Sequence, residues 1–137
     1  MTTQTEARAL KGRVMVVDDN PMNQTLARTM IGRLGLDVQI IETGEATLEA
    51  LALPDAVLPQ VILLDCQLPG IDGYETAAQI RANPSEKIKS IPIVALTGNV
   101  FPWDLDKCFA IGMNDYMTKP FKLEDLRKVL EKFLPIY

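Results

Sequence analysis

The chain has 137 residues, of which 47% are hydrophobic and 23% are charged, and its formal net charge is −4. This length and composition fit one globular domain with a single core, and the acidic balance argues against a nucleic-acid surface or a polybasic membrane contact. The sequence contains no histidine. That absence excludes Ser-His-Asp and Cys-His catalysis, a histidine-ligated metal and a phosphohistidine carried by this chain.

Apolar runs and helical periodicities alternate along the chain. The first helix is indicated by Met22, Leu26 and Met30 at steps of four, with Ile31 and Leu34 beside them. Asn20 and Pro21 suit the start of that helix. The patterns predict strands over residues 14–17, 38–41, 61–64, 91–96 and 116–118, and helices over residues 21–34, 44–53, 74–82, 104–111 and 123–133.

Connections of this length favour parallel strands with right-handed crossovers. The expected fold is therefore an α/β domain, a doubly wound five-stranded parallel sheet with helices on both faces. We expect residues 1–12 to be a flexible N-terminal segment and residues 13–137 to form the domain. The loop 84–90 is a second candidate for disorder.

The cysteines and the N-terminal residues indicate the cellular compartment in which the chain is expected to work. Cys66 and Cys108 form no C-x-x-C pair and are too few for a zinc site, so buried free thiols in a reducing compartment are expected. Residues 1–11 lack the apolar stretch of a signal peptide, and the apolar runs are too short to span a bilayer. A cytoplasmic domain is the expectation.

Polar side chains follow the predicted strands at their carboxyl ends. Asp18 and Asp19 follow the first strand, Asp65 the third, Thr97 the fourth and Lys119 the fifth. Ligands of open parallel sheets bind at this edge. Three carboxylates, one hydroxyl and one ammonium are therefore expected to converge there.

This combination of groups predicts phosphoryl chemistry. Carboxylates that lie close together raise one another's pKa, and a divalent cation relieves the conflict. All-oxygen ligands favour Mg²⁺ or Mn²⁺. A cation and Lys119 beside a free carboxylate would stabilise a transferring phosphoryl group, with Asp65 as the nucleophile, Thr97 as a hydroxyl donor and Gly98 leaving room. Each residue alone has an ordinary structural explanation, as a helix cap, a turn former or a strand end.

Four segments carry a family resemblance over about residues 13–134. They are the acidic pair 18–19, the segment 64–73 (LDCQLPGIDG), the strand end 96–98 (LTG) and the segment 116–121 (YMTKPF). In this order and spacing, they resemble the receiver domain of two-component response regulators. The pattern around residues 18–23 (DDNPMN) looks most like receivers attached to hybrid histidine kinases.

The resemblance implies roles for individual residues. Asp65 would be the phosphoacceptor. Asp19, Asp65 and the main-chain carbonyl of Gln67 would bind Mg²⁺ directly, and Asp18 would act mainly through a metal-bound water. Lys119 would hold a phosphoryl oxygen.

The resemblance also implies a switch and its partners. Thr97 would move toward the phosphoryl group, Tyr116 would turn inward behind it, and the bond before Pro120 would be cis. The sheet would have the flavodoxin-like order 2-1-3-4-5. The face formed by helix 104–111, strand 116–118 and helix 123–133 would contact a target protein. The phosphodonor would be a histidine kinase or a histidine phosphotransfer protein, with neither nucleic acid nor membrane as a partner.

The expected function is thus a phosphorylation-dependent signalling switch, not an enzyme beyond its own phosphorylation and dephosphorylation. Gln67 and Asn99 occupy positions that in the family influence the lifetime of the phosphate. Trp103, six residues beyond Thr97, is either an ordinary, partly buried aromatic residue or, as a sharper hypothesis, a residue whose fluorescence reports phosphorylation.

Three other functions remain open from the sequence. A pseudo-receiver would bind partners without being phosphorylated. A metal-dependent phosphohydrolase of the haloacid dehalogenase type usually has a second Asp two residues after the nucleophile, but this chain has Gln67 at that position. A flavin mononucleotide protein would want a Ser/Thr/Gly-rich loop after the first strand, and this chain has acidic residues there.

Overall fold

The structure is a computed structural model that describes residues 11–98 and 102–134, with backbone only for residues 102–104. Five strands alternate with the helices. The strands are β1 (Arg13–Val17), β2 (Asp37–Ile41), β3 (Val61–Asp65), β4 (Ile93–Thr97) and β5 (Asp115–Thr118). The helices are α2 (Pro21–Arg33), α3 (Gly44–Ala52), α4 (Gly73–Arg81), α5 (Glu86–Lys89), α6 (Pro102–Ile111) and α7 (Leu123–Glu131).

Short polar side chains start three of the helices. The side chain of Asn20 accepts the Met22 N–H at 2.8 Å and so caps α2 as the sequence predicts. Thr43 caps α3, and Asp72 caps α4. Each cap satisfies a backbone donor that has no partner inside its helix. These caps fix where each helix leaves the carboxyl edge of the sheet.

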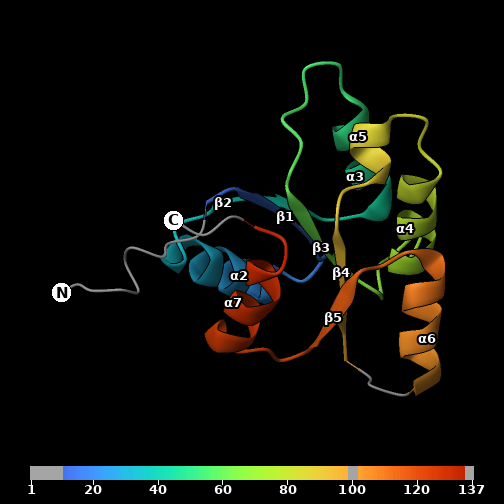
Figure 1. The fold of residues 1–137 in the computed structure, drawn as a ribbon. Coiled ribbons are helices and arrows are strands. Elements are labelled where there is room, and N and C mark those ends of the chain that lie inside the picture. The colour runs from blue at the N-terminus through green and yellow to red at the C-terminus, as the bar shows by residue number, and fades with distance from the viewer. Residues whose placement is uncertain (1–10, 99–101, 135–137) are drawn as a thin grey trace.

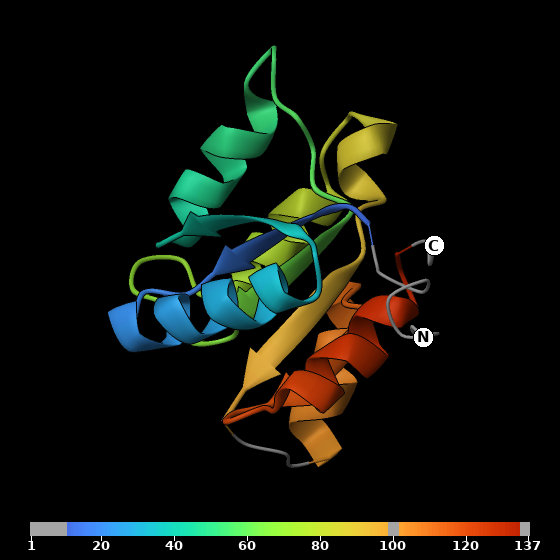
Figure 2. The same cartoon turned by 90° about the vertical axis from the view of Figure 1, so that its left-hand side faces the viewer.

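The sheet is parallel throughout, in the order β2-β1-β3-β4-β5. The helices α2 and α7 cover one face, and α3, α4 and α6 cover the other (Figure 1). The arrowheads of β1 and β4 point the same way in Figure 2. The predicted doubly wound fold and its strand order are therefore confirmed.

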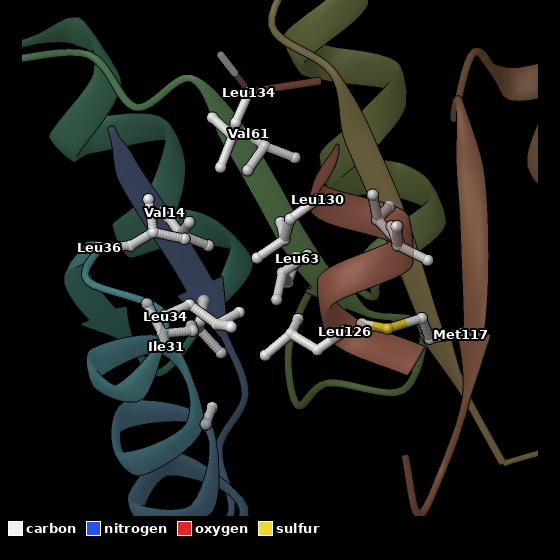
Figure 3. Packing of buried hydrophobic residues seen from close by; sticks show 14 of the residues in the cluster. Val14, Ile31, Leu34, Leu36, Val61, Leu63, Met117, Leu126, Leu130 and Leu134 are labelled. Atoms are coloured by element: carbon white, nitrogen blue, oxygen red, sulfur yellow. The ribbon is translucent and has the colours of Figure 1, made fainter. Parts of the chain in front are cut away.

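Two apolar clusters hold the three layers together. One packs α2 and α7 against the sheet, with Ile31, Leu34, Leu126 and Leu130 meeting strand residues such as Leu63 (Figure 3). The other packs α3, α4, α5 and α6 against the opposite face. The residues of β3 and β4 are all buried, as expected for central strands covered on both faces.

Two predictions about local structure are wrong. The segment 84–90 is not a disordered loop, because α5 forms there and Ile88 is buried against the second cluster. The fourth strand begins at Ile93 rather than Ile91, because the Ile91 N–H bonds the Ile88 carbonyl in the turn after α5.

The apolar side chains that indicated α2 divide between core and surface. Ile31 and Leu34 are buried, together with Ala27. Met22 and Leu26 are exposed, at 74% and 49%, because they lie on a neighbouring face of the helix. Among the described residues, no helix is long and apolar enough to cross a membrane.

Candidate functional site

The acidic residues meet where neighbouring strands end. Val17 of β1 pairs with Leu64 of β3, so Asp18 follows beside Asp65. Each of Asp18, Asp19 and Asp65 offers a carboxylate oxygen, and these atoms all lie within 4.8 Å of one another. Asp18 and Asp65 are buried, whereas Asp19 is exposed and opens the group to solvent. The predicted convergence of three carboxylates is present.

Lys119 supplies the positive charge of the site. Its Nζ lies 2.8 Å from Oδ2 of Asp65 and 3.2 Å from Oδ2 of Asp18. Its main-chain N–H donates to the carbonyl of Thr97 at 2.8 Å, which aligns the end of β5 with that of β4. The bond between Lys119 and Pro120 is cis, the form that the resemblance implies. One ammonium therefore serves two buried carboxylates.

Main-chain donors hold two of the acids in place. The Gln67 N–H donates to Oδ1 of Asp65 at 3.0 Å, and the Asn20 N–H donates to Oδ1 of Asp18 at 2.9 Å. The side-chain amide of Gln24 donates to the main-chain carbonyl of Asp18 at 2.6 Å. The turn after β3 thus brings the main chain of Gln67 next to Asp65.

The pKa values show how incompletely these charges are balanced. Burial raises the pKa of Asp65, and the neighbouring Asp18 adds to the rise, against the hydrogen bonds from Lys119 and Gln67. Burial lowers the pKa of Lys119, but its contacts with Asp65 and Asp18 outweigh burial and raise it overall. A cation bound beside such a buried carboxylate would stabilise its ionised form and lower its pKa.

The donor set fits a hard divalent cation. Three carboxylates and one ammonium leave a formal excess of two negative charges at one edge of the sheet. Every side-chain donor in the acidic group is an oxygen, and Mg²⁺ and Mn²⁺ prefer oxygen ligands. Asp18, Asp19, Asp65 and the nearby carbonyl of Gln67 could hold such an ion.

The other predicted residues lie around this group. Thr97 is buried at the end of β4, and Tyr116, on β5, is half-buried and packs against the α3–α6 face of the core. A Cβ added at Gly98 would meet no described atom within 4 Å, so the space beside it is open. Asn99 and the side chain of Trp103 lie outside the described residues, and the fluorescence expectation stays a prediction.

The two cysteines lie behind the site. Cys66 and Cys108 are free and buried, as predicted. Cys66 directly follows Asp65, and burial raises the pKa of its thiol to about 12, with the nearby Cys108 contributing. A thiol of such high pKa is a packing residue, not a nucleophile.

Sequence reasoning missed Gln24 and Glu45. Gln24 contacts Asp18 as described above, and the carboxylate of Glu45 accepts the N–H of Ile71, in the loop after Asp65, at 3.2 Å. Both residues stand at helix positions where polar side chains are ordinary. Only the folded arrangement brings them to the site, so no local pattern could have identified them.

Comparisons with known proteins point to one family. The family model described as "Response regulator receiver domain" matches residues 14–131. Hybrid signal transduction histidine kinase L of Dictyostelium discoideum is 35% identical over 127 residues, which are 90% of this chain. The chain spans only 7% of the length of that relative.

Two solved structures are similar over most of this chain. The receiver domain of sensor histidine kinase PA1611 from Pseudomonas aeruginosa PAO1 is 37% identical, with a TM-score of 0.76, and covers 90% of this chain and 97% of its own. That structure has a magnesium ion coordinated in the active site cleft. The Mn²⁺-bound form of response regulator Rcp1 is 28% identical, with a TM-score of 0.72, and covers 88% of this chain and 90% of its own.

The family model covers most of the chain, and the sheet order and the acidic group are those that the resemblance implies. Receiver domains are signalling domains of two-component systems. The chain belongs to the response regulator receiver domain family.

Proposed function

We propose that this receiver is a phosphorylation-dependent switch in which Asp65 accepts the phosphoryl group. The observation that supports this most directly is the position of the Asp65 carboxylate. It is buried, lies 2.8 Å from the ammonium of Lys119 and shares an acidic group with Asp18 and Asp19. The ammonium of Lys119, together with a cation bound by the acidic group, would stabilise the negative oxygen atoms of a phosphoryl group beside this carboxylate.

The metal of this site is Mg²⁺, with Mn²⁺ as an alternative. Asp19, Asp65 and the main-chain carbonyl of Gln67 would hold it directly, and Asp18 would act mainly through a metal-bound water. The metal-bound structures of the PA1611 receiver and of Rcp1 support this assignment. When bound, the ion neutralises charge on the phosphoryl oxygens.

Phosphoryl transfer then follows from the chain's own groups. A carboxylate oxygen of Asp65 forms a bond to phosphorus while the P–N bond of the donor phosphohistidine breaks, and the imidazole leaves with that electron pair. Lys119 binds a phosphoryl oxygen, and the hydroxyl of Thr97 donates to another. Later attack by water releases inorganic phosphate and restores Asp65. The domain catalyses only these steps on itself.

The phosphodonor is a histidine kinase or a histidine phosphotransfer protein, as the kinase relatives suggest. Thr97 and Tyr116 respond to the phosphoryl group and shift the face formed by α6, β5 and α7, where a target protein binds. The domain comprises residues 13–137. It works in the cytoplasm, where reducing conditions keep Cys66 and Cys108 as free thiols.

Intact mass spectrometry after incubation with acetyl phosphate, with and without Mg²⁺, tests this proposal. The expected result is a gain of one phosphoryl group that requires Mg²⁺ and is absent in Asp65→Asn. Glu49→Gln, on the exposed side of α3, serves as the matched control and should gain the group as the wild type does. A folded protein that gains nothing under any condition would instead be a pseudo-receiver with phosphate-independent partners.

A further inference from the structure

The loop between β3 and α4 carries the proposed carbonyl ligand of the metal. Its two ends are fixed by the neighbouring chain, since the Gln67 N–H bonds Asp65 and the Gly73 N–H bonds the Cys66 carbonyl at 3.1 Å. The middle of the loop is exposed around Gly70. How well the carbonyl oxygen of Gln67 is held in position therefore depends on the contacts made by the middle of the loop.

Glu45, in the first turn of α3, contacts that middle. Its Oε2 accepts the N–H of Ile71 at 3.2 Å. Gly70 has a φ of +74°, and a Cβ placed on it would lie 2.5 Å from the same oxygen. The carboxylate of Glu45 thus lies directly against Gly70, whose positive φ is a conformation that favours glycine.

The start of α3 is itself fixed against the loop. A Cβ on Gly44 would lie 2.7 Å from Cγ1 of Ile71 and would collide with Oγ1 of Thr76 on α4. The side chain of Thr43 caps the helix through the Ala46 N–H at 3.0 Å. Because the start of α3 is packed this closely, the backbone of Glu45 is held in a fixed position relative to the loop.

We propose that Glu45 is a positioning residue of the metal site: its carboxylate holds the 67–71 loop so that the main chain of Gln67 is ready to bind the cation. This inference rests on the proposed function, which places Gln67 among the ligands. Groups that orient metal ligands in this way typically change metal affinity by about 10- to 100-fold when removed.

A second way for Glu45 to act is through its charge, since one more carboxylate near the site attracts a cation. The two explanations predict different results for two substitutions. Glu45→Gln removes the charge but keeps an oxygen that can accept the Ile71 N–H. Glu45→Ala removes both.

Isothermal titration calorimetry of Mg²⁺ binding to the wild type, Glu45→Ala, Glu45→Gln and the control Glu49→Ala tests the proposal. Glu45→Ala should raise the Mg²⁺ dissociation constant about tenfold. Glu45→Gln should stay within about threefold of the wild type, and Glu49→Ala, one turn further along the exposed side of α3, should match it. Hydrogen exchange of the Ile71 amide without metal should be faster in Glu45→Ala than in Glu45→Gln.

Other outcomes overturn the inference. Equal loss of affinity in Glu45→Gln and Glu45→Ala would assign the effect to charge. Unchanged affinity in Glu45→Ala, with wild-type binding intact, would refute the positioning role and leave the proposed function standing. Absence of Mg²⁺ binding in the wild type would remove both.

Discussion

Asp65 carries a charge that its surroundings only partly balance. Burial raises its pKa, so the folded protein favours the neutral form of this side chain more than the unfolded chain does. The substitution Asp65→Asn should therefore stabilise the metal-free protein at neutral pH, because Lys119 keeps its ion pair with Asp18. We expect a melting temperature higher by roughly 2–5 °C, measured by circular dichroism in EDTA.

The stability difference between Asp65→Asn and the wild type should depend on pH in a defined direction. Since the folded-state pKa is the higher one, ionised Asp65 lowers stability above it, and this cost disappears as the pH falls through the folded-state pKa toward the unfolded one. The gap between Asp65→Asn and the wild type should be widest near pH 7 and close as the pH approaches about 4. A gap that widens on acidification would contradict the assignment.

At the scale of elements, Arg81 joins α4 to segments of the chain that lie far from it in sequence. It is the last residue of α4, and its guanidinium donates to the carbonyls of Gly112, Lys89 and Ile91 at 2.7–2.8 Å and to Oδ1 of Asn114 at 2.9 Å. These bonds link α4 to α5, to the approach to β4 and to the turn after α6.

Removing the guanidinium leaves those acceptors without their charged donor. Arg81→Met keeps most of the apolar stem, and we expect it to lower the free energy of unfolding by about 2–4 kcal/mol, measured by urea denaturation. Arg127→Met is the matched control, because Arg127 makes a surface pair with Glu131 at 3.4 Å, worth at most about 0.5 kcal/mol. If the two substitutions lowered the free energy of unfolding equally, the hydrogen bonds of Arg81 between elements would contribute no more than a surface ion pair.

The same elements show what sequence patterns predict well. The apolar runs and the capping residue Asn20 act within a few residues, so the five strands and the start of α2 could be predicted from the sequence, apart from the exact start of β4. The short helix α5 was missed because its support is the burial of Ile88 against distant residues. The strand-end acids could be predicted, since a parallel sheet brings strand ends together, whereas Glu45 and Gln24 depend on how helices sit against that edge.

For the whole molecule, the two apolar clusters stabilise the fold while the carboxyl edge gathers like charges. A cation that binds only the folded state should therefore raise the stability of the entire domain. At a Mg²⁺ concentration ten times its dissociation constant, the gain is about 1.4 kcal/mol, a rise of roughly 5 °C in melting temperature. Asp65→Asn, which lacks one of the proposed ligands, should gain much less, so that Mg²⁺ narrows or reverses the difference in melting temperature expected in EDTA. Sodium chloride at equal ionic strength is the control, and the same rise in sodium chloride would show that screening, rather than a bound ion, relieves the repulsion.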